Sequence, residues 1–292
     1  MPFTGLRGRK ANPSYLNRVM PAEETEMDAL PPRGESELPT DILGAARDGL
    51  AAVRVRRPRI HCITNTVAQA FTANALLALG AVPSMTTAPD EIAAFAGGAD
   101  GLLVNLGTLE PERRAVIRTA IEAASAAGRP FLLDPVFIDR SAGRAAFARD
   151  LAALGPAAIR GNGAEIAVLD TDADALALRL GTVVAATGET DLVTDGRRLA
   201  AVANGHPLMA RVTAMGCAGA AITTAFIAVG EDAFTATAAA MVVLGIAGER
   251  AAETARGPGS FASAYLDALY ALEADDIAAR ARVTSPSQGE AS

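Results

Sequence analysis

The chain of 292 residues lacks tryptophan, has only 4% aromatic residues and contains two cysteines. Two cysteines far apart do not form the disulfide framework of a small secreted protein, so we expect two reduced thiols. Basic residues are also too few for a polyanion-binding protein: the net charge is −7, and no basic stripe with interleaved aromatics appears. This composition argues against nucleic acid or an acidic membrane surface as the main partner.

Long, strongly apolar runs are missing as well. The longest apolar stretches, 214–230 and 233–248, are rich in alanine and contain threonine and glycine. They predict buried helices, because a membrane span needs about 20 strongly apolar residues. Residues 1–40 have no apolar segment of the signal-peptide kind and are too acidic for a transit peptide. We therefore expect a cytoplasmic protein with a disordered extension at 1–40 and a flexible tail at 281–292.

Between these ends, short apolar runs alternate with helical segments rich in alanine and leucine. The runs predict strands at 59–64, 82–86, 101–106, 131–136, 157–160 and 182–186. The helical segments are 67–79, 89–96, 111–127, 143–154 and 164–169. A hairpin is expected at 192–203, followed by helices from Cys217 to about Arg280. The pattern predicts one α/β domain over 41–280, with a mostly parallel central sheet and helices on both faces.

Polar residues follow the predicted strands at their carboxyl ends, the edge where open α/β sheets bind ligands. They include Asn65, Asn105, Asp134, Arg160 and Thr187. Asp134 either holds a Mg²⁺ that bridges nucleotide phosphates or caps the turn before Pro135. Arg160 either clamps a phosphate or forms a surface salt bridge, and Thr187 either binds a nucleotide or belongs to a plain turn.

Glu165 opens a predicted helix soon after Arg160. It is either a metal-associated carboxylate or an acidic residue that complements the helix dipole.

A second helix start, at 211–221, brings small residues into a long alanine-rich segment with Cys217 at the junction. Unblocked backbone N–H groups at a helix N-terminus suit an anion, above all phosphate. This turn is therefore the predicted phosphate site.

Several short motifs occur in a fixed order along the chain. They are HCITN at 61–65, GAVPSM at 80–85, NLGTL at 105–109, LDPV at 133–136, IRGN at 159–162, GHPLM at 205–209, VTAMGC at 212–217 and GPGSF at 257–261. The series resembles the hydroxyethylthiazole kinases, which belong to the ribokinase-like superfamily, and covers about 41–275. The resemblance implies a ribokinase-like three-layer fold and transfer of the γ-phosphate of ATP to the hydroxyl of 4-methyl-5-(2-hydroxyethyl)thiazole in thiamine salvage. It also implies Mg²⁺ and a homotrimer with active sites between subunits.

The resemblance assigns a role to each matching position. It implies that Met85, Asn65 and Ala214 contact the thiazole, that Arg160 and Thr187 contact ATP, and that Asp134 and Glu165 are associated with Mg²⁺. Met215, Gly216 and Cys217 match the catalytic anion-hole turn. The wider superfamily has an aspartate as base where this chain has Cys217. We expect the helix N-terminus to lower the pKa of this thiol, so that it orients or weakly deprotonates the substrate alcohol.

Three departures from the family pattern bear on this interpretation. Residues 137–141 read FIDRS where a glycine-rich stretch is usual, and Ala214 replaces a glycine. If Ala214 has a positive φ, it is strained. The stretch 169–182 is also shorter, which predicts that part of the nucleotide-side covering is missing. The alternatives are a weak or inactive nucleotide- or thiazole-binding relative, a hydroxymethylpyrimidine kinase and an ATP-dependent hydrate dehydratase.

Overall fold

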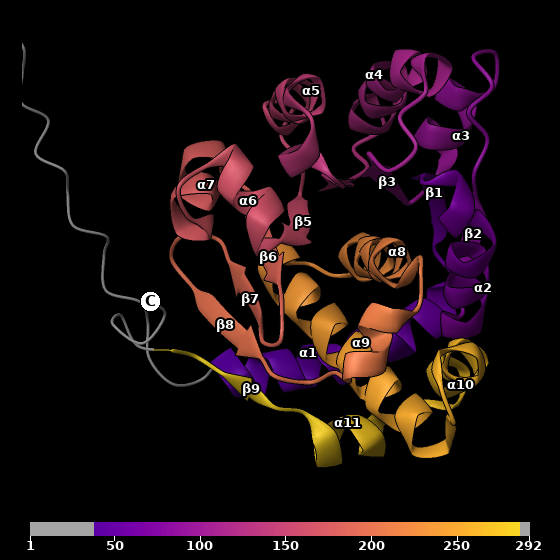
Figure 1. The fold of residues 1–292 in the computed structure, drawn as a ribbon, viewed down its shortest axis with the longest axis vertical. Coiled ribbons are helices and arrows are strands. Elements are labelled where there is room, and N and C mark those ends of the chain that lie inside the picture. The colour runs from indigo at the N-terminus through magenta and orange to yellow at the C-terminus, as the bar shows by residue number, and fades with distance from the viewer. Residues whose placement is uncertain (1–37, 287–292) are drawn as a thin grey trace, which may run out of the picture. The chain divides into compact units, whose positions relative to one another are not determined.

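The structure is a computed structural model that describes residues 38–286. Its strands form one sheet in the order β2-β1-β3-β4-β5-β6-β7-β8-β9 (Figure 1). The parallel part consists of β2 (Val82–Ser84), β1 (Arg59–Ile63), β3 (Gly101–Asn105), β4 (Phe131–Asp134), β5 (Ala158–Asn162) and β6 (Val183–Thr187). The antiparallel part consists of β7 (Asp191–Thr194), β8 (Leu199–Val202) and β9 (Val283–Thr284).

Helices cover both faces of the sheet, and each face has its own apolar cluster. The first cluster lies under α1 (Leu38–Arg56), α2 (Gln69–Leu79), α8 (Met215–Val229), α9 (Ala233–Thr254), α10 (Pro258–Ala271) and α11 (Ala274–Arg280). The second lies under α3 (Ile92–Gly98), α4 (Pro111–Ala126), α5 (Ala142–Ala152), α6 (Gly163–Leu169) and α7 (Ala173–Leu180). Three 3₁₀ turns complete the described elements: η1 (Thr66–Ala68), η2 (Ile138–Arg140) and η3 (Pro207–Arg211). This is the predicted three-layer α/β arrangement.

Alternation along the strands decides which residues reach which face. Cys62, Leu103, Leu132, Ala158 and Ala185 all belong to the cluster on the side of α8 and α9. Their strand neighbours, such as Val104 and Leu133, belong to the opposite cluster. The residues two positions further on therefore share the α8 face at the carboxyl edge: Thr64, Asn105, Asp134, Arg160 and Thr187.

The six predicted parallel strands and the hairpin are all present, with ends within a few residues of those expected. Two α-helices and one strand were not predicted. Helix α1 begins at Leu38, helix α7 fills the stretch where a gap in the covering was expected, and β9 lies within the predicted flexible tail, paired with β8. Most of the predicted N-terminal extension lies outside the described residues.

Helix α9 is long and apolar enough to cross a membrane by length and composition. However, 78% of its most apolar 18-residue stretch is buried inside the fold, where the helix packs against α1, α8 and α10. Such burial is typical of a core helix, as the alanine-rich sequence predicts.

Candidate active site

Asn105 joins two of the predicted site residues at the carboxyl edge of the sheet. It is fully buried, and its Nδ2 donates to Oδ2 of Asp134 at 2.5 Å and to Sγ of Cys217 at 3.2 Å. The backbone N–H of Gly107 donates to Oδ1 of Asn105 at 2.9 Å, which fixes the orientation of the amide. The ends of β3 and β4 and the start of α8 therefore meet at one side chain, and Asp134 and Cys217 lie close together.

Burial sets the protonation of both groups. It raises the pKa of Asp134 to about 7; the nearby Glu165 adds to this shift, whereas Arg160 and Asn105 oppose it. Burial also raises the pKa of the Cys217 thiol to about 11, and the charge of Asp134 adds to the shift. The expectation of a lowered thiol pKa is therefore wrong, because desolvation and a neighbouring carboxylate outweigh the helix N-terminus. Cys217 is a neutral thiol at physiological pH.

The turn before α8 has the predicted strain. Ala214 is the N-cap of the helix with φ 72° and ψ −6°, in the left-handed region. No side chain of the described chain caps this helix, so the N–H groups of Gly216 and Cys217 have no capping partner. These donors, together with the helix dipole, form the anion-binding N-terminus that the sequence predicts.

Arg160 lies across the first turns of α8. Its Nη1 donates to the carbonyl of Gly216 at 3.1 Å, and its Nε is buried without a hydrogen-bond partner among the described residues. A Cβ at Gly219 would lie 2.9 Å from Nη2 of Arg160, so a larger residue there would displace the guanidinium from this position. The guanidinium is thus held beside the helix N-terminus with a donor unused.

Glu165 lies near Asp134, but its two oxygens already accept backbone hydrogen bonds. Oε2 accepts from the N–H of Asn162 at 2.9 Å in a capping box of α6, and Oε1 accepts from the N–H of Phe137 at 2.9 Å. Phe137 itself has φ 60° and is 56% exposed. Glu165 therefore anchors the loop after β4, in which Phe137 is a second strained residue without the freedom of glycine.

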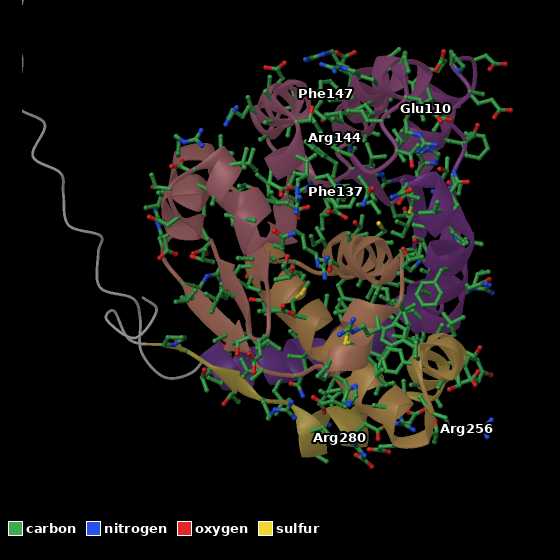
Figure 2. The ribbon with its side chains drawn as sticks, in the orientation of Figure 1. Glu110, Phe137, Arg144, Phe147, Arg256 and Arg280 are labelled. Carbon is green, nitrogen blue, oxygen red and sulfur yellow. The ribbon has the colours of Figure 1, made fainter. Side chains whose placement is uncertain are left out.

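Arg144 connects the loops that follow β3 and β4. Its Nη1 donates to the carbonyls of Leu106, Gly107 and Val136. Figure 2 shows Arg144 and Phe137 in the region between α5 and α8. The sequence does not single out Arg144, because its contacts form only when the loops after β3 and β4 lie beside α5 in the folded chain.

Two of the three predicted thiazole-contacting residues, Asn65 and Met85, lie toward the β2 side of the same edge, whereas Ala214 lies at the start of α8. Asn65 follows β1, caps η1 and accepts a hydrogen bond from Thr108 Oγ1 at 2.7 Å. The backbone approaches closely here, since a Cβ at Gly107 would lie 2.6 Å from Asn65. Met85 follows β2, is half-buried and packs against the apolar cluster that includes Met215.

Thr187 ends β6 opposite Asn162, and its Oγ1 donates to the carbonyl of Gly161 at 3.3 Å.

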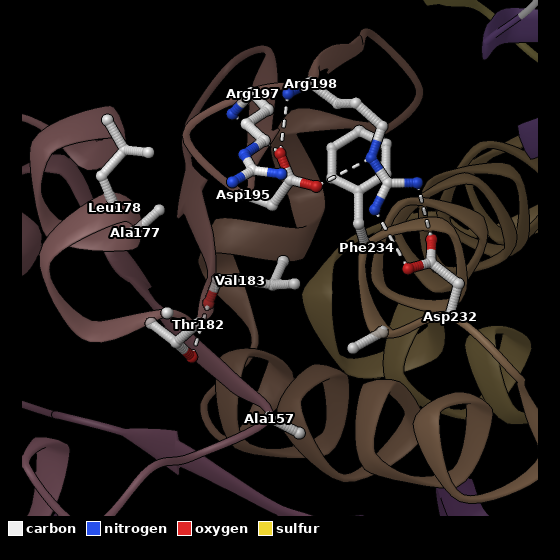
Figure 3. A pocket seen from close by; sticks show the side chains of 12 residues that line it. Ala157, Ala177, Leu178, Thr182, Val183, Asp195, Arg197, Arg198, Asp232 and Phe234 are labelled. Atoms are coloured by element: carbon white, nitrogen blue, oxygen red, sulfur yellow. Dashed lines mark hydrogen bonds and ion pairs between the residues drawn. The ribbon is translucent and has the colours of Figure 1, made fainter. Parts of the chain in front are cut away.

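A separate cavity of about 430 Å³ lies at the opposite edge of the sheet, near the amino ends of β5 and β6 (Figure 3). Its wall includes Arg198, which is paired with Asp195 and Asp232. None of the predicted site residues lines this cavity, so it is distinct from the candidate site.

Comparison with known proteins agrees with this geometry. Residues 50–275 match the model of the hydroxyethylthiazole kinase family. This chain belongs to that family. The chain is 46% identical over 238 residues to the probable hydroxyethylthiazole kinase of Agrobacterium fabrum, covering 82% of this chain and 94% of that protein. The predicted family membership is therefore confirmed.

Solved structures support the fold of this family member. The hydroxyethylthiazole kinase of Pyrococcus horikoshii superposes with a TM-score of 0.80 at 39% identity, covering 82% of this chain and 98% of that one. A ribokinase-like superfamily protein of Enterococcus faecalis superposes with a TM-score of 0.57 at 13% identity, covering 74% of this chain and 88% of that one. The second likeness concerns the fold alone, and the predicted ribokinase-like fold is confirmed.

Proposed function

We propose that this chain transfers the γ-phosphoryl group of ATP to the hydroxyl of hydroxyethylthiazole. The observation that carries the proposal is the 46% identity to the probable hydroxyethylthiazole kinase of Agrobacterium fabrum over 94% of that protein. The geometry supports it: an uncapped helix N-terminus, a guanidinium and a buried carboxylate converge at the ligand-binding edge of the sheet. Phosphoryl transfer needs this combination, because catalysis consists largely of positioning and of neutralising charge on the phosphoryl oxygens.

Asp134 is the carboxylate that fits Mg²⁺ best. Its Oδ2 accepts a hydrogen bond from Asn105, whereas its Oδ1 has no hydrogen-bond partner among the described residues and is available as a metal ligand. The described residues contain no group of three or more histidine, cysteine or acidic side chains placed to hold a metal. That agrees with Mg²⁺, which takes one or two carboxylates and fills its other positions with water and substrate phosphates. Bound Mg²⁺ would neutralise phosphate charge. Glu165 would act nearby, mainly by fixing the loop.

In this scheme the N–H groups of Gly216 and Cys217 and the guanidinium of Arg160 bind the phosphates of ATP. Met215 and Ala214 shape the turn, Thr187 contacts the nucleotide, and Asn65 and Met85 border the thiazole. The substrate oxygen bonds to the γ-phosphorus as the bond to the β,γ-bridging oxygen breaks, releasing ADP and the hydroxyl proton. A loose transition state needs little base assistance before attack. Cys217 therefore orients the alcohol as a neutral thiol.

We further propose a cytoplasmic homotrimer with active sites between subunits, and neither nucleic acid nor a membrane as partner. The family resemblance supports the trimer, and the net charge of −7 fits the absence of polyanionic partners. Analytical ultracentrifugation tests the assembly: a trimer is expected, and a monomer that retains full kinase activity would contradict active sites shared between subunits.

Incubation of the protein with Mg-ATP and hydroxyethylthiazole tests the activity. We expect thiazole phosphate and ADP in equal amounts, detected by mass spectrometry, and no turnover after Arg160→Ala. Parallel incubations replace the thiazole with hydroxymethylpyrimidine or with a nicotinamide-cofactor hydrate. Turnover of one of these in place of the thiazole would favour the other ribokinase-like enzymes. Binding without any turnover would favour a ligand-binding relative with the altered loop at 137–141.

A further inference from the structure

His61 lies on β1, on the sheet face opposite α8, and is fully buried. Its Nδ1 lies 2.8 Å from Oγ of Ser84, and its Nε2 lies 3.1 Å from the carbonyl oxygen of Thr86. A carbonyl only accepts, so Nε2 carries the hydrogen and Nδ1 accepts from the hydroxyl of Ser84. Burial also lowers the pKa of His61. The imidazole is thus held as one neutral tautomer with both nitrogens bonded to the same short segment.

That segment has little other attachment to the sheet. Within the described chain β2 is an edge strand, and its pairing with β1 ends at Ser84 opposite His61. Residues 85–88 form neither strand nor helix. Their side-chain hydrogen bonds are local: Thr86 Oγ1 donates to Glu91 and accepts from the N–H of Ala88. Beyond the last ladder pair, His61 supplies the described hydrogen bond that ties this segment to the sheet.

Met85 lies between the two residues that His61 holds. Met85 follows the end of β2, and its side chain lies on the α8 side of the sheet, whereas the imidazole lies on the opposite side. Met85 packs against the apolar cluster on the α8 side, which includes Met215 at the start of α8. The imidazole therefore holds the backbone from one side of the sheet, while Met85 packs on the α8 side, on which the strand-end site residues also lie.

We propose that His61 is a positioning residue for the substrate pocket: by holding Ser84 and Thr86 from behind, it fixes Met85 and sets the affinity for the thiazole. The proposal rests on the proposed function for the identity of the ligand. The geometry of the two hydrogen bonds of His61, here called the clamp, is independent of that identity. Loss of the clamp should weaken binding of the thiazole at Met85. Binding of ATP should not change, because in the proposed function its phosphates bind at the start of α8.

Steady-state kinetics test the proposal with His61→Leu, which removes both hydrogen bonds, and Ser84→Ala, which removes one. We expect the KM for the thiazole to rise about 25-fold in His61→Leu and about fivefold in Ser84→Ala, at roughly fivefold per net hydrogen bond. The KM for ATP and kcat should change less than twofold. His61→Gln keeps an N–H that can reach the Thr86 carbonyl and should restore much of the affinity.

Cys62→Ala is the matched control, because Cys62 is equally buried on the same strand but faces the other apolar cluster. Hydrogen exchange provides a readout independent of activity. Amides of residues 85–88 should exchange faster in His61→Leu than in the wild type, and not in Cys62→Ala. If the wild type phosphorylates no thiazole, the proposed function fails while exchange still decides the clamp.

Unchanged exchange at residues 85–88 in both His61→Leu and Ser84→Ala would overturn the clamp. A fall in kcat, or an equal rise in both KM values, would overturn a role confined to thiazole affinity. If His61→Leu does not fold, Ser84→Ala carries the test, since it leaves the apolar packing around β1 intact.

Discussion

Two residues with side chains adopt the left-handed conformation at the ligand-binding edge. Ala214 has φ 72° at the start of α8, and Phe137 has φ 60° in the loop after β4. Each such residue costs about 1–2 kcal/mol relative to the right-handed region. Ala214 precedes the N–H groups that we assign to phosphate binding, and the N–H of Phe137 is held by Glu165. Such strain persists where the surrounding structure over-determines the backbone.

Replacing Ala214 by glycine should relieve one of these costs. We expect Ala214→Gly to raise the free energy of unfolding by about 1 kcal/mol, since glycine adopts a positive φ without a steric penalty. Urea denaturation measures the change. Ala228→Gly is the control: Ala228 lies in the last turn of α8, where the backbone is right-handed and glycine should lower stability by up to about 1 kcal/mol. A loss of stability in Ala214→Gly would contradict the strain.

The thiol of Cys217 is assigned an orienting role rather than that of a thiolate base. Cys217→Ala removes the group that positions the alcohol and should lower kcat about tenfold, with the KM for ATP unchanged. Cys217→Ser keeps a short hydrogen-bonding group and should stay within about threefold of the wild type. Steady-state kinetics with both substrates measure this, and unchanged kcat in Cys217→Ala would remove the thiol from the mechanism.

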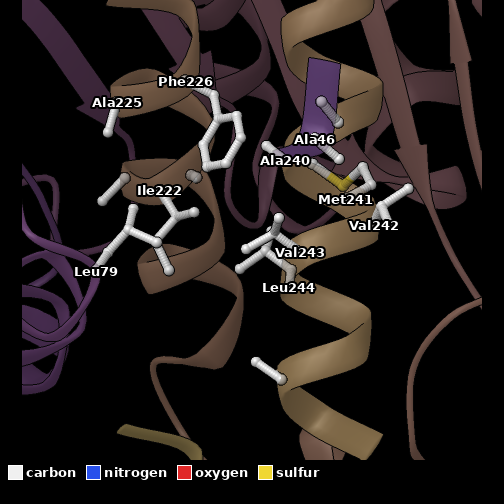
Figure 4. Packing of buried hydrophobic residues seen from close by; sticks show 14 of the residues in the cluster. Ala46, Leu79, Ile222, Ala225, Phe226, Ala240, Met241, Val242, Val243 and Leu244 are labelled. Carbon is white, nitrogen blue, oxygen red and sulfur yellow. The ribbon is translucent and has the colours of Figure 1, made fainter. Parts of the chain in front are cut away.

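At the scale of elements, the site depends on how α8 meets the strand ends. Apolar packing against α9 and the β1–β3–β4 surface fixes the axis of α8 (Figure 4). Phe226 is one of its largest buried side chains, and a Cβ at Gly49 of α1 would lie 2.7 Å from its ring. With the axis fixed in this way, the polar contact of Asn105 sets the position of Cys217 relative to Asp134.

Removal of this contact should separate catalysis from stability. We expect Asn105→Ala to lower kcat by about 10- to 100-fold, because Asp134 and Cys217 lose their common donor. This is less than the roughly 10²- to 10³-fold loss for a donor that touches the transition state, since Asn105 acts through its two partners. Asn204→Ala is a close control. Asn204 is also buried with three hydrogen bonds, to Glu249, Arg280 and Arg282, away from the site. Both variants should lose similar stability, measured by thermal unfolding, while kcat falls only in Asn105→Ala.

The same elements show what a sequence can and cannot predict. The strands and the polar residues after them were predictable, because apolar runs and parallel topology place strand ends at one edge. The direction of the Cys217 pKa shift was not predictable, because the thiol becomes buried only when β3, β4 and α8 meet in space. The contacts of Arg144 and Asn105 were likewise not predictable, because their partners lie far away in sequence or on other strands. The short strand β9 gives no periodic signal over two residues.

For the molecule as a whole, the buried carboxylate of Asp134 opposes the usual dependence of stability on pH. The pKa of Asp134 is raised to about 7 from a model-compound value of 3.8, chiefly by burial. Between these values the unfolded chain releases this proton while the folded chain retains it. The unfolded state then binds fewer protons, so the contribution of Asp134 to the free energy of unfolding falls as pH rises from about 4 to about 7. Other carboxylates act in the opposite direction at lower pH, such as Asp232, whose hydrogen bonds outweigh its burial and lower its pKa to about 2.

Asp134→Asn isolates this contribution, because the amide cannot ionise. In EDTA, we expect the variant to gain stability relative to the wild type by on the order of 2 kcal/mol between pH 5 and pH 8, while kinase activity is lost. Urea denaturation at several pH values measures the difference between the two proteins, so the other carboxylates cancel. Asp139→Asn serves as the control, because it removes a carboxylate from the exposed part of the same loop. Addition of Mg²⁺ should stabilise the wild type at pH 8 and leave Asp134→Asn unchanged, because only the carboxylate offers the metal a charged ligand. A pH-independent difference would contradict a carboxyl group that is neutral in the folded state below pH 7 and costly when charged.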